Sequence, residues 1–116
     1  MYACYTFAME LAQKKCVACE GTEKPFTREE AEVLMKQLSG WTLSGDARWI
    51  SKDLKFKDFK EALAFVDKVG AVAESEGHHP DIQLSWGKAA IELTTHAIKG
   101  LSENDFILAA KIDRIA

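Results

Sequence analysis

The sequence lacks any apolar run approaching the roughly 20 residues that a membrane-spanning helix needs. It also lacks an excess of basic residues, because 15 Lys and Arg stand against 18 Asp and Glu, for a formal net charge of −3. A protein held to nucleic acid mainly through phosphate contacts needs the opposite balance. We therefore expect neither a membrane contact nor a direct nucleic-acid contact.

The chain is short, with 116 residues and only two prolines, so it has room for one domain. Its composition, 47% apolar and 28% charged, is that of an ordinary globular protein with a real core. The first residues lack the basic segment, long apolar stretch and cleavage site of a secretory signal. The absence of these features predicts a cytoplasmic location.

Cysteines are few and lie close together, at positions 4, 16 and 19. An odd number without a secretory signal argues against a disulfide framework. Cys16 and Cys19 form a C-x-x-C pair, but no second pair or nearby histidine completes the four ligands of a structural zinc site. We interpret residues 1–25 as an N-terminal extension, a mobile arm with reduced cysteines and a short helix around residues 7–15. Weak metal binding and redox chemistry are the alternatives.

Hydrophobic periodicity divides residues 26–116, the predicted domain, into alternating helices and hairpins. Thr27 and Glu30 form a capping box before a helix that Ser39-Gly40 should stop, and Ser102 with Asp105 at N3 opens the last helix. Between them we predict a hairpin over residues 41–56, a long helix from Asp58 to near Gly77, and a second hairpin over residues 81–97 with its turn at Gly87-Lys88.

The resulting order, α-β-β-α-β-β-α, predicts an α+β fold with a four-stranded antiparallel sheet and helices packed on one face. In the last helix, from residue 102 onward, apolar residues occupy more than one stripe. Because a single core-facing stripe would be narrower, we expect part of this surface to face another subunit in a homodimer or homotetramer.

All three histidines lie between positions 78 and 96. Pro80 disfavours helix at His79, which places His78 and His79 on the bend between a helix and a strand. The following hairpin should bring His96, on the polar face of its strand with Thr94 and Glu92, back beside them. Glu74, one turn before His78, could orient that imidazole. Because histidine titrates near neutral pH, one pocket holding all three could both give and take protons.

Structural explanations compete with each of these assignments. A surface His-His pair is more often without function than catalytic, and Glu74 and Glu76 could simply be a solvated helix end. Thr94 and Glu92 could be the wet side of the sheet, and helix capping fully explains Asp105. Trp41 and Trp86 are more often core residues than stacking platforms. A three-histidine metal site is disfavoured, because no H-x-H or H-x₃-H spacing is present.

The histidines belong to a longer pattern: Glu74-x₃-His78-His79-Pro80, an aromatic at Trp86, Thr94-Thr95-His96 and Asp105. This pattern closely resembles the signature of the pterin-4a-carbinolamine dehydratases, also called dimerization cofactors of a homeodomain transcription factor. The resemblance runs from about Thr27 to the C-terminus and leaves the first 25 residues outside. It also includes Ser39-Gly40-Trp41, Phe59, Phe65 and Gly100-Leu101-Ser102.

The resemblance implies an enzyme that dehydrates 4a-hydroxytetrahydrobiopterin to quinonoid dihydropterin and recycles the pterin cofactor of aromatic amino-acid hydroxylases. It implies no metal and no cofactor, since the pterin is the substrate. Acid/base and substrate contacts would come from His78, His79 and His96, with Glu74 supporting His78. Gly77, Pro80, Thr94 and Thr95 would shape the pterin pocket, and Trp41 and Asp105 would add secondary contacts.

A binding module is the competing class. Members of the resembled family also stabilise a dimeric transcription factor, which would give this chain a non-catalytic role and a nuclear location. The last helix, with its broad apolar surface, would then be the docking element. Turnover of the hydroxylated pterin by purified protein separates the two classes.

Overall fold

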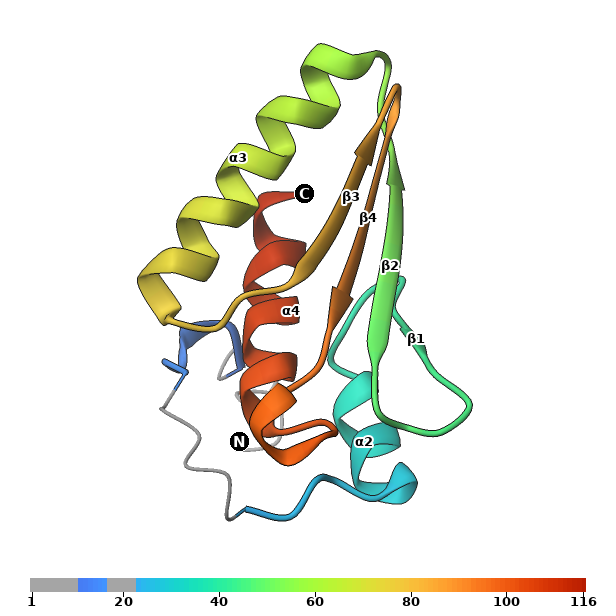
Figure 1. Ribbon diagram of the computed structural model, residues 1–116, viewed down its shortest axis with the longest axis vertical. Coiled ribbons are helices and arrows are strands. Elements are labelled where there is room, and N and C mark those ends of the chain that lie inside the picture. The colour runs from blue at the N-terminus through green and yellow to red at the C-terminus, as the bar shows by residue number, and fades with distance from the viewer. Residues whose placement is uncertain (1–10, 17–22) are drawn as a thin grey trace, which may run out of the picture.

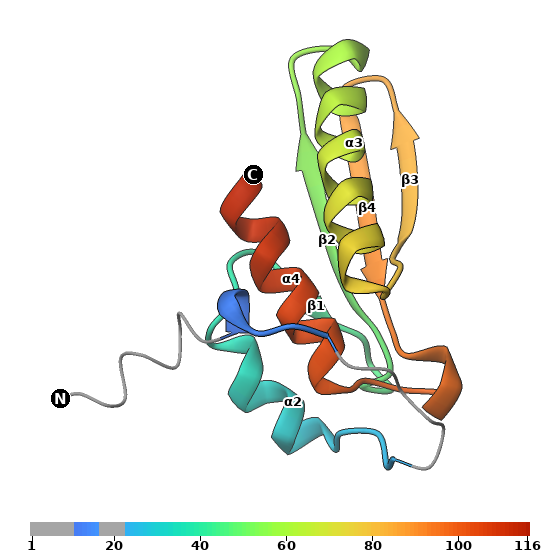
Figure 2. The same ribbon diagram turned by 90° about the vertical axis from the view of Figure 1, so that its left-hand side faces the viewer.

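A four-stranded antiparallel sheet organises the fold, in the order β1-β2-β4-β3. The computed structural model describes residues 11–16 and 23–116. Helices α3 and α4 lie against one face of the sheet, and α2 lies beside β1 (Figures 1 and 2). The predicted α+β fold is confirmed. The strands are β1 (Thr42–Leu43), β2 (Ile50–Lys55), β3 (Asp81–Ser85) and β4 (Lys88–Leu93), and the helices are α2 (Arg28–Met35), α3 (Phe59–Glu76), the short 3₁₀ helix η1 (His96–Ile98) and α4 (Glu103–Ile115).

The alternation of side chains along β4 determines which sheet face is buried. Ala89, Ile91 and Leu93 are fully buried, and Ile50 of β2 pairs with Leu93. A shift of one residue would expose this whole set to solvent, so burial of one face fixes the pairing. Among the described residues, no helix combines the length and apolar character needed to cross a bilayer.

The helix caps confirm most of the predicted boundaries. Asp58 accepts the N–H of Glu61 at the start of α3, and Gly77, in the left-handed conformation with φ of 67°, ends it. The Thr27 capping box opens α2 as predicted. However, α2 ends at Met35 and not at Ser39-Gly40, because residues 36–38 make shorter-range bonds to carbonyls three residues back.

The turn of the second hairpin lies one residue earlier than predicted. Ser85 pairs with Lys88, so Trp86 and Gly87 make the turn and Lys88 begins β4. Gly87 has φ of 69°, a conformation that favours glycine. The Trp86 side chain is 73% exposed at this turn, so the interpretation of Trp86 as a core residue is wrong.

The broad apolar surface of α4 is covered within the chain itself. Residues Asn104–Ala110 and Ile112 are all buried. The sheet and α3 cover one side, and Leu11 joins the same core from the N-terminal segment, which crosses α4 in Figure 2. The prediction that this surface faces another subunit is therefore wrong for α4, and self-association as a dimer or tetramer stays a prediction.

Residues 11–16 form a strap across the domain. The Lys111 ammonium donates to the Ala12 carbonyl at 2.8 Å, and the Cys16 N–H donates to Glu76 Oε1 at 2.8 Å. Cys16 is thus anchored and does not lie in a mobile arm as predicted. The helical residues 11–13 match the end of the helix predicted over residues 7–15, whereas residues 7–10, Cys4 and Cys19 lie outside the described residues.

Burial, with the nearby Glu76 carboxylate, raises the pKa of the Cys16 thiol to about 12. Since the thiolate is the reactive species, the environment of Cys16 disfavours redox chemistry and metal binding at this position.

Glu76→Gln should lower the free energy of unfolding by about 1 kcal/mol at pH 7, because Glu76 receives the Cys16 N–H and pairs with Lys111 at 3.6 Å. The hydrogen bond from Cys16 lowers the pKa of Glu76 below its ordinary 4.5. The charged form therefore stabilises the fold above pH 4.5, and this contribution disappears as the pH falls through the folded-state pKa. Urea denaturation across pH 3–7 should show the difference between the two proteins closing at low pH.

Glu32→Gln is the matched control, because Glu32 makes an exposed ion pair with Arg28 one turn away. Its effect should stay small and nearly independent of pH. A Glu76→Gln difference that persists at pH 3 would contradict the role assigned to the Glu76 charge.

Candidate active site

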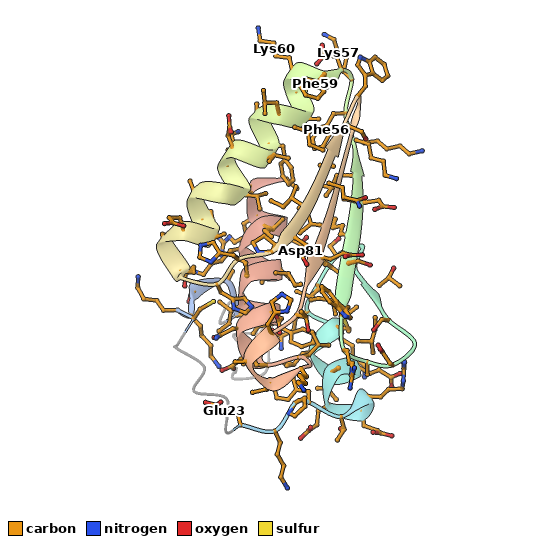
Figure 3. All side chains as sticks on the ribbon, in the orientation of Figure 1. Glu23, Phe56, Lys57, Phe59, Lys60 and Asp81 are labelled. Atoms are coloured by element: carbon orange, nitrogen blue, oxygen red, sulfur yellow. The ribbon has the colours of Figure 1, made fainter. Side chains whose placement is uncertain are left out.

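The bend between α3 and β3 carries the paired histidines. Because Gly77 adopts the left-handed conformation, the chain leaves the helix axis there, and the His78 N–H still bonds to the Ala73 carbonyl. Pro80 then precedes Asp81, the first residue of β3, which Figure 3 labels. In the described structure the predicted site residues Gly77 and Pro80 thus have a conformational role, because together they place His78 and His79 at one end of the sheet.

His78 is held by a buried carboxylate. Its Nε2 lies 2.7 Å from Oδ1 of Asp105, and the two side chains are 12% and 0% exposed. A carboxylate only accepts hydrogen bonds, so His78 donates to Asp105 through Nε2–H, and in the neutral form of the imidazole Nδ1 is the nitrogen with a free lone pair. Oδ2 of Asp105 accepts the Thr95 hydroxyl at 2.7 Å and the Ser102 N–H at 2.9 Å. Asp105 therefore both caps α4 and orients His78, so capping alone does not explain it.

His79, and not His78, pairs with Glu74. His79 Nε2 lies 2.8 Å from Glu74 Oε1, and the side chains are 61% and 82% exposed. The prediction that Glu74 orients His78 is wrong, because the left-handed turn at Gly77 carries His78 away from the surface of α3 and toward α4. Glu74 is thus a solvent-exposed residue at the end of α3 that contacts His79.

Thr94, Thr95 and His96 follow β4 and do not extend its polar face as predicted. Thr95 closes a small loop with Gly100 through two backbone hydrogen bonds, of 2.8 and 3.4 Å, and His96 begins η1 inside that loop. Both threonines are buried, and the Thr94 hydroxyl donates to the Arg48 carbonyl at 2.6 Å. His96 is exposed, and its ring meets the Trp49 ring edge-on at 5.9 Å.

The three histidines flank the same end of the sheet from two sides. His78 reaches the Thr95 hydroxyl through Asp105, on the β3 side. His96 lies on the β2 side, where it lines a pocket of about 170 Å³ with Arg48, Trp49, Thr94 and Lys99. His78 and His79 are not among the residues lining this pocket, so the structure brings the histidines to one region and not into one cavity.

Trp41 lies away from the histidines. Its indole is only 8% exposed, and its N–H donates to Oδ1 of Asp113 at 2.9 Å, near the C-terminal end of α4. Asp113 is eight residues along the helix from Asp105, or about 12 Å at 1.5 Å per residue. The interpretation of Trp41 as a core residue is confirmed, and the structure does not place it at the candidate site.

Three residues of the pocket had escaped the sequence interpretation: Arg48, Trp49 and Lys99. They come from the loop before β2 and from the end of η1, and no periodicity or motif connects these two segments. Within residues 11–16 and 23–116, no group of three His, Cys, Asp or Glu side chains is placed to hold a metal ion.

Comparison with known proteins identifies the family of the chain. The family model described as pterin 4 alpha carbinolamine dehydratase matches residues 24–115. A relative from Halorhodospira halophila, named provisionally as a pterin-4-alpha-carbinolamine dehydratase, is 50% identical over 107 residues, which are 92% of this chain and 98% of its own. A relative of the same name from Rubrobacter xylanophilus is 48% identical over 106 residues, 91% of this chain and 98% of its own.

Two solved structures share the fold. A transcriptional coactivator/pterin dehydratase from Brucella melitensis superposes with a TM-score of 0.75 at 30% identity, covering 80% of this chain and 99% of its own. A pterin dehydratase-like protein described as a RuBisCO assembly factor in the alpha-carboxysome gives a TM-score of 0.58 at 25% identity. The match covers 67% of this chain and 90% of that protein. With its matched residues spanning both the sheet and the histidine bend, the chain belongs to the pterin 4 alpha carbinolamine dehydratase family.

Proposed function

We propose that this protein dehydrates 4a-hydroxytetrahydropterins, such as 4a-hydroxytetrahydrobiopterin, to quinonoid dihydropterins by histidine acid/base catalysis. In this reaction the C4a–O bond breaks, the hydroxyl leaves with a proton as water, and N5 loses its proton as the C4a–N5 double bond forms. The family and the names of its members support the dehydratase activity. The reaction is redox-neutral, and the proposal assigns the enzyme no metal and no cofactor of its own.

The hydrogen bond between His78 and the buried Asp105 is the main observation that supports this proposal. Because Asp105 accepts from Nε2–H, a neutral His78 presents Nδ1 as its unprotonated nitrogen, and the hydrogen bond restricts rotation of the ring. A positioned imidazole of this kind is suited to accept a proton, and we assign it the proton of pterin N5.

The proton donor to the departing hydroxyl is one of the two exposed imidazoles, His79 or His96. Glu74 accepts from His79 and balances the charge of its imidazolium. His96 lines the pocket, where it can contact a bound pterin directly. The hydroxyl of buried Thr94 donates to the Arg48 carbonyl beside the pocket, and the hydroxyl of buried Thr95 donates to Asp105, which holds His78.

Replacing the histidines one at a time tests the assignment. His78→Ala, His79→Ala and His96→Ala should be compared by stopped-flow absorbance, with the spontaneous dehydration of the hydroxylated pterin subtracted. Loss of one general acid or base should lower the catalysed rate by about 10²- to 10⁴-fold. The variant that loses the acidic limb of the pH–rate profile identifies the base. If all three variants keep full activity, the proposed mechanism is wrong.

In the cell, this activity would recycle the pterin cofactor oxidised by aromatic amino-acid hydroxylases. The alternative, a non-catalytic cofactor of a transcription factor, would dock through the last helix, but the apolar residues of α4 are buried within the described part of the chain. The observations therefore favour the enzyme, and the cytoplasmic location stays a prediction.

A further inference from the structure

The pocket beside His96 is strongly basic. Of its five lining residues, Arg48 and Lys99 are cationic, His96 can become so, and Trp49 and Thr94 are neutral. No carboxylate lines the pocket. Among the described residues, neither Arg48 nor Lys99 has a carboxylate within ion-pair distance, and both side chains are exposed.

The carboxylate of Asp46 lies near Arg48, two residues before it in the chain. This carboxylate accepts the Ser44 hydroxyl at 2.6 Å and the backbone N–H of Arg48 at 3.1 Å. The hydrogen bond from Ser44 lowers the pKa of Asp46, and Arg48 adds a weaker electrostatic effect. Asp46 is thus committed to its own turn, and the guanidinium of Arg48 remains available to a ligand.

The backbone on both sides of the pocket is strained. Ala47 (φ 59°) and Lys99 (φ 57°) are the two non-glycine residues with positive φ in the described part of the chain. Ala47 directly precedes Arg48, and Lys99 itself lines the pocket. A left-handed conformation is costly for residues with a Cβ, and such strain is concentrated at functional sites. The two cationic residues thus lie at, or directly after, these left-handed positions.

Resting on the proposed dehydratase function, we propose that this pocket binds a phosphate ester on the side chain of the pterin. The substrate class is then 4a-hydroxytetrahydropterins with an anionic side chain. The planar guanidinium of Arg48 can bind two phosphate oxygens at once, and Lys99 adds a point charge. Because His96 belongs to the same pocket, binding of the phosphate there places the pterin ring beside an imidazole of the proposed mechanism.

The test compares kcat/KM for two 4a-hydroxytetrahydropterins, one with a neutral hydroxylated side chain and one with the same side chain phosphorylated. We expect the wild-type protein to prefer the phosphorylated form by about 10- to 100-fold at low salt, since charge-assisted contacts have this size. Arg48→Gln with Lys99→Gln should bring the ratio close to one. Lys99→Gly removes the charge and suits the left-handed conformation, so it keeps the test valid if the double variant fails to fold.

Lys60→Gln is the charge-matched control, because Lys60 lies at the opposite end of the molecule in Figure 3, and it should leave the substrate ratio unchanged. Equal kcat/KM values for the two substrates in the wild-type protein, or a preference that survives removal of both cations, would overturn the proposal. If neither substrate is turned over, the dehydratase function fails separately. Calorimetric titration with the phosphorylated and neutral dihydropterins then tests phosphate binding by the pocket. Tighter binding of the phosphorylated form, weakened by Lys99→Gly, supports the proposal, and equal binding of the two forms contradicts it.

Discussion

Asp105→Asn should lower the catalysed dehydration rate by about 10²- to 10⁴-fold while the protein stays folded. The asparagine oxygen can replace Oδ2 of Asp105, which accepts the Ser102 N–H and the Thr95 hydroxyl. The amide NH₂ then takes the place of Oδ1 and faces Nε2 of His78. Because two donors cannot share a hydrogen bond, His78 must move its proton from Nε2 to Nδ1. The nitrogen assigned as the base is thereby blocked.

Asp113→Asn provides the matched control on the same helix. Asp113 also accepts three donors, from Ser39, Trp41 and Lys52, but it lies two turns away from Asp105. The Asp113 variant should lose stability and keep its activity. A pH–rate profile separates the two explanations for Asp105, since loss of the base changes the shape of the profile and a purely structural defect lowers the rate equally at every pH. Full activity in Asp105→Asn would contradict the role of His78 as the base.

Local signals in the sequence predict most of the fold because each acts within a few residues. Asp58 and Gly77 bound α3, and the alternation of Ala89, Ile91 and Leu93 sets the buried face of β4. Such signals need no knowledge of distant contacts. The same locality explains the errors at Ser39-Gly40 and at the turn of the second hairpin, where competing local hydrogen bonds shift the boundary by one to four residues.

The candidate site depends on contacts between distant residues, which local sequence patterns cannot predict. A spacing of four residues would place His78 beside Glu74 only if the helix continued that far. Gly77 ends the helix, so Glu74 contacts His79 instead. The pairing of His78 with Asp105 spans 27 residues and depends on the way α4 packs beside α3. The motif therefore identifies the chemical groups, and the tertiary structure decides which of them are paired.

The N-terminal segment shows the same limit. Nothing in the spacing of Cys16 and Cys19 indicates that Cys16 lies against Glu76 and the Asn104 carbonyl, which are 60 and 88 residues away in sequence. Glu76 directly precedes Gly77 and Asn104 directly precedes Asp105, so both lie next to residues of the candidate site. The strap over residues 11–16 thus supports the elements that hold His78, although it lies outside the matched family model.

Phe106→Ala should destabilise the protein by about 3–5 kcal/mol. Phe106 is the largest fully buried side chain among the described residues, and its ring lies 5.9 Å from that of Phe26. Truncation to alanine leaves a cavity between α4 and the segment before α2, and surrounding side chains fill such cavities only in part. Because a domain of this size is stable by about 5–15 kcal/mol, this single change removes a large share of the total.

Denaturation in guanidinium chloride measures this loss, with Phe59→Ala as the control of identical chemistry. Phe59 is 43% exposed at the start of α3, so its truncation should cost at most about 1 kcal/mol. A loss below about 1.5 kcal/mol for Phe106→Ala would show that the core around α4 can collapse onto the cavity. Phe106→Leu, which keeps most of the buried volume, should recover much of the stability and retain the dehydration rate at 25 °C. Its retained activity would show that the hydrogen bonds of Asp105, and not the packing of the neighbouring ring, determine the catalytic geometry of His78.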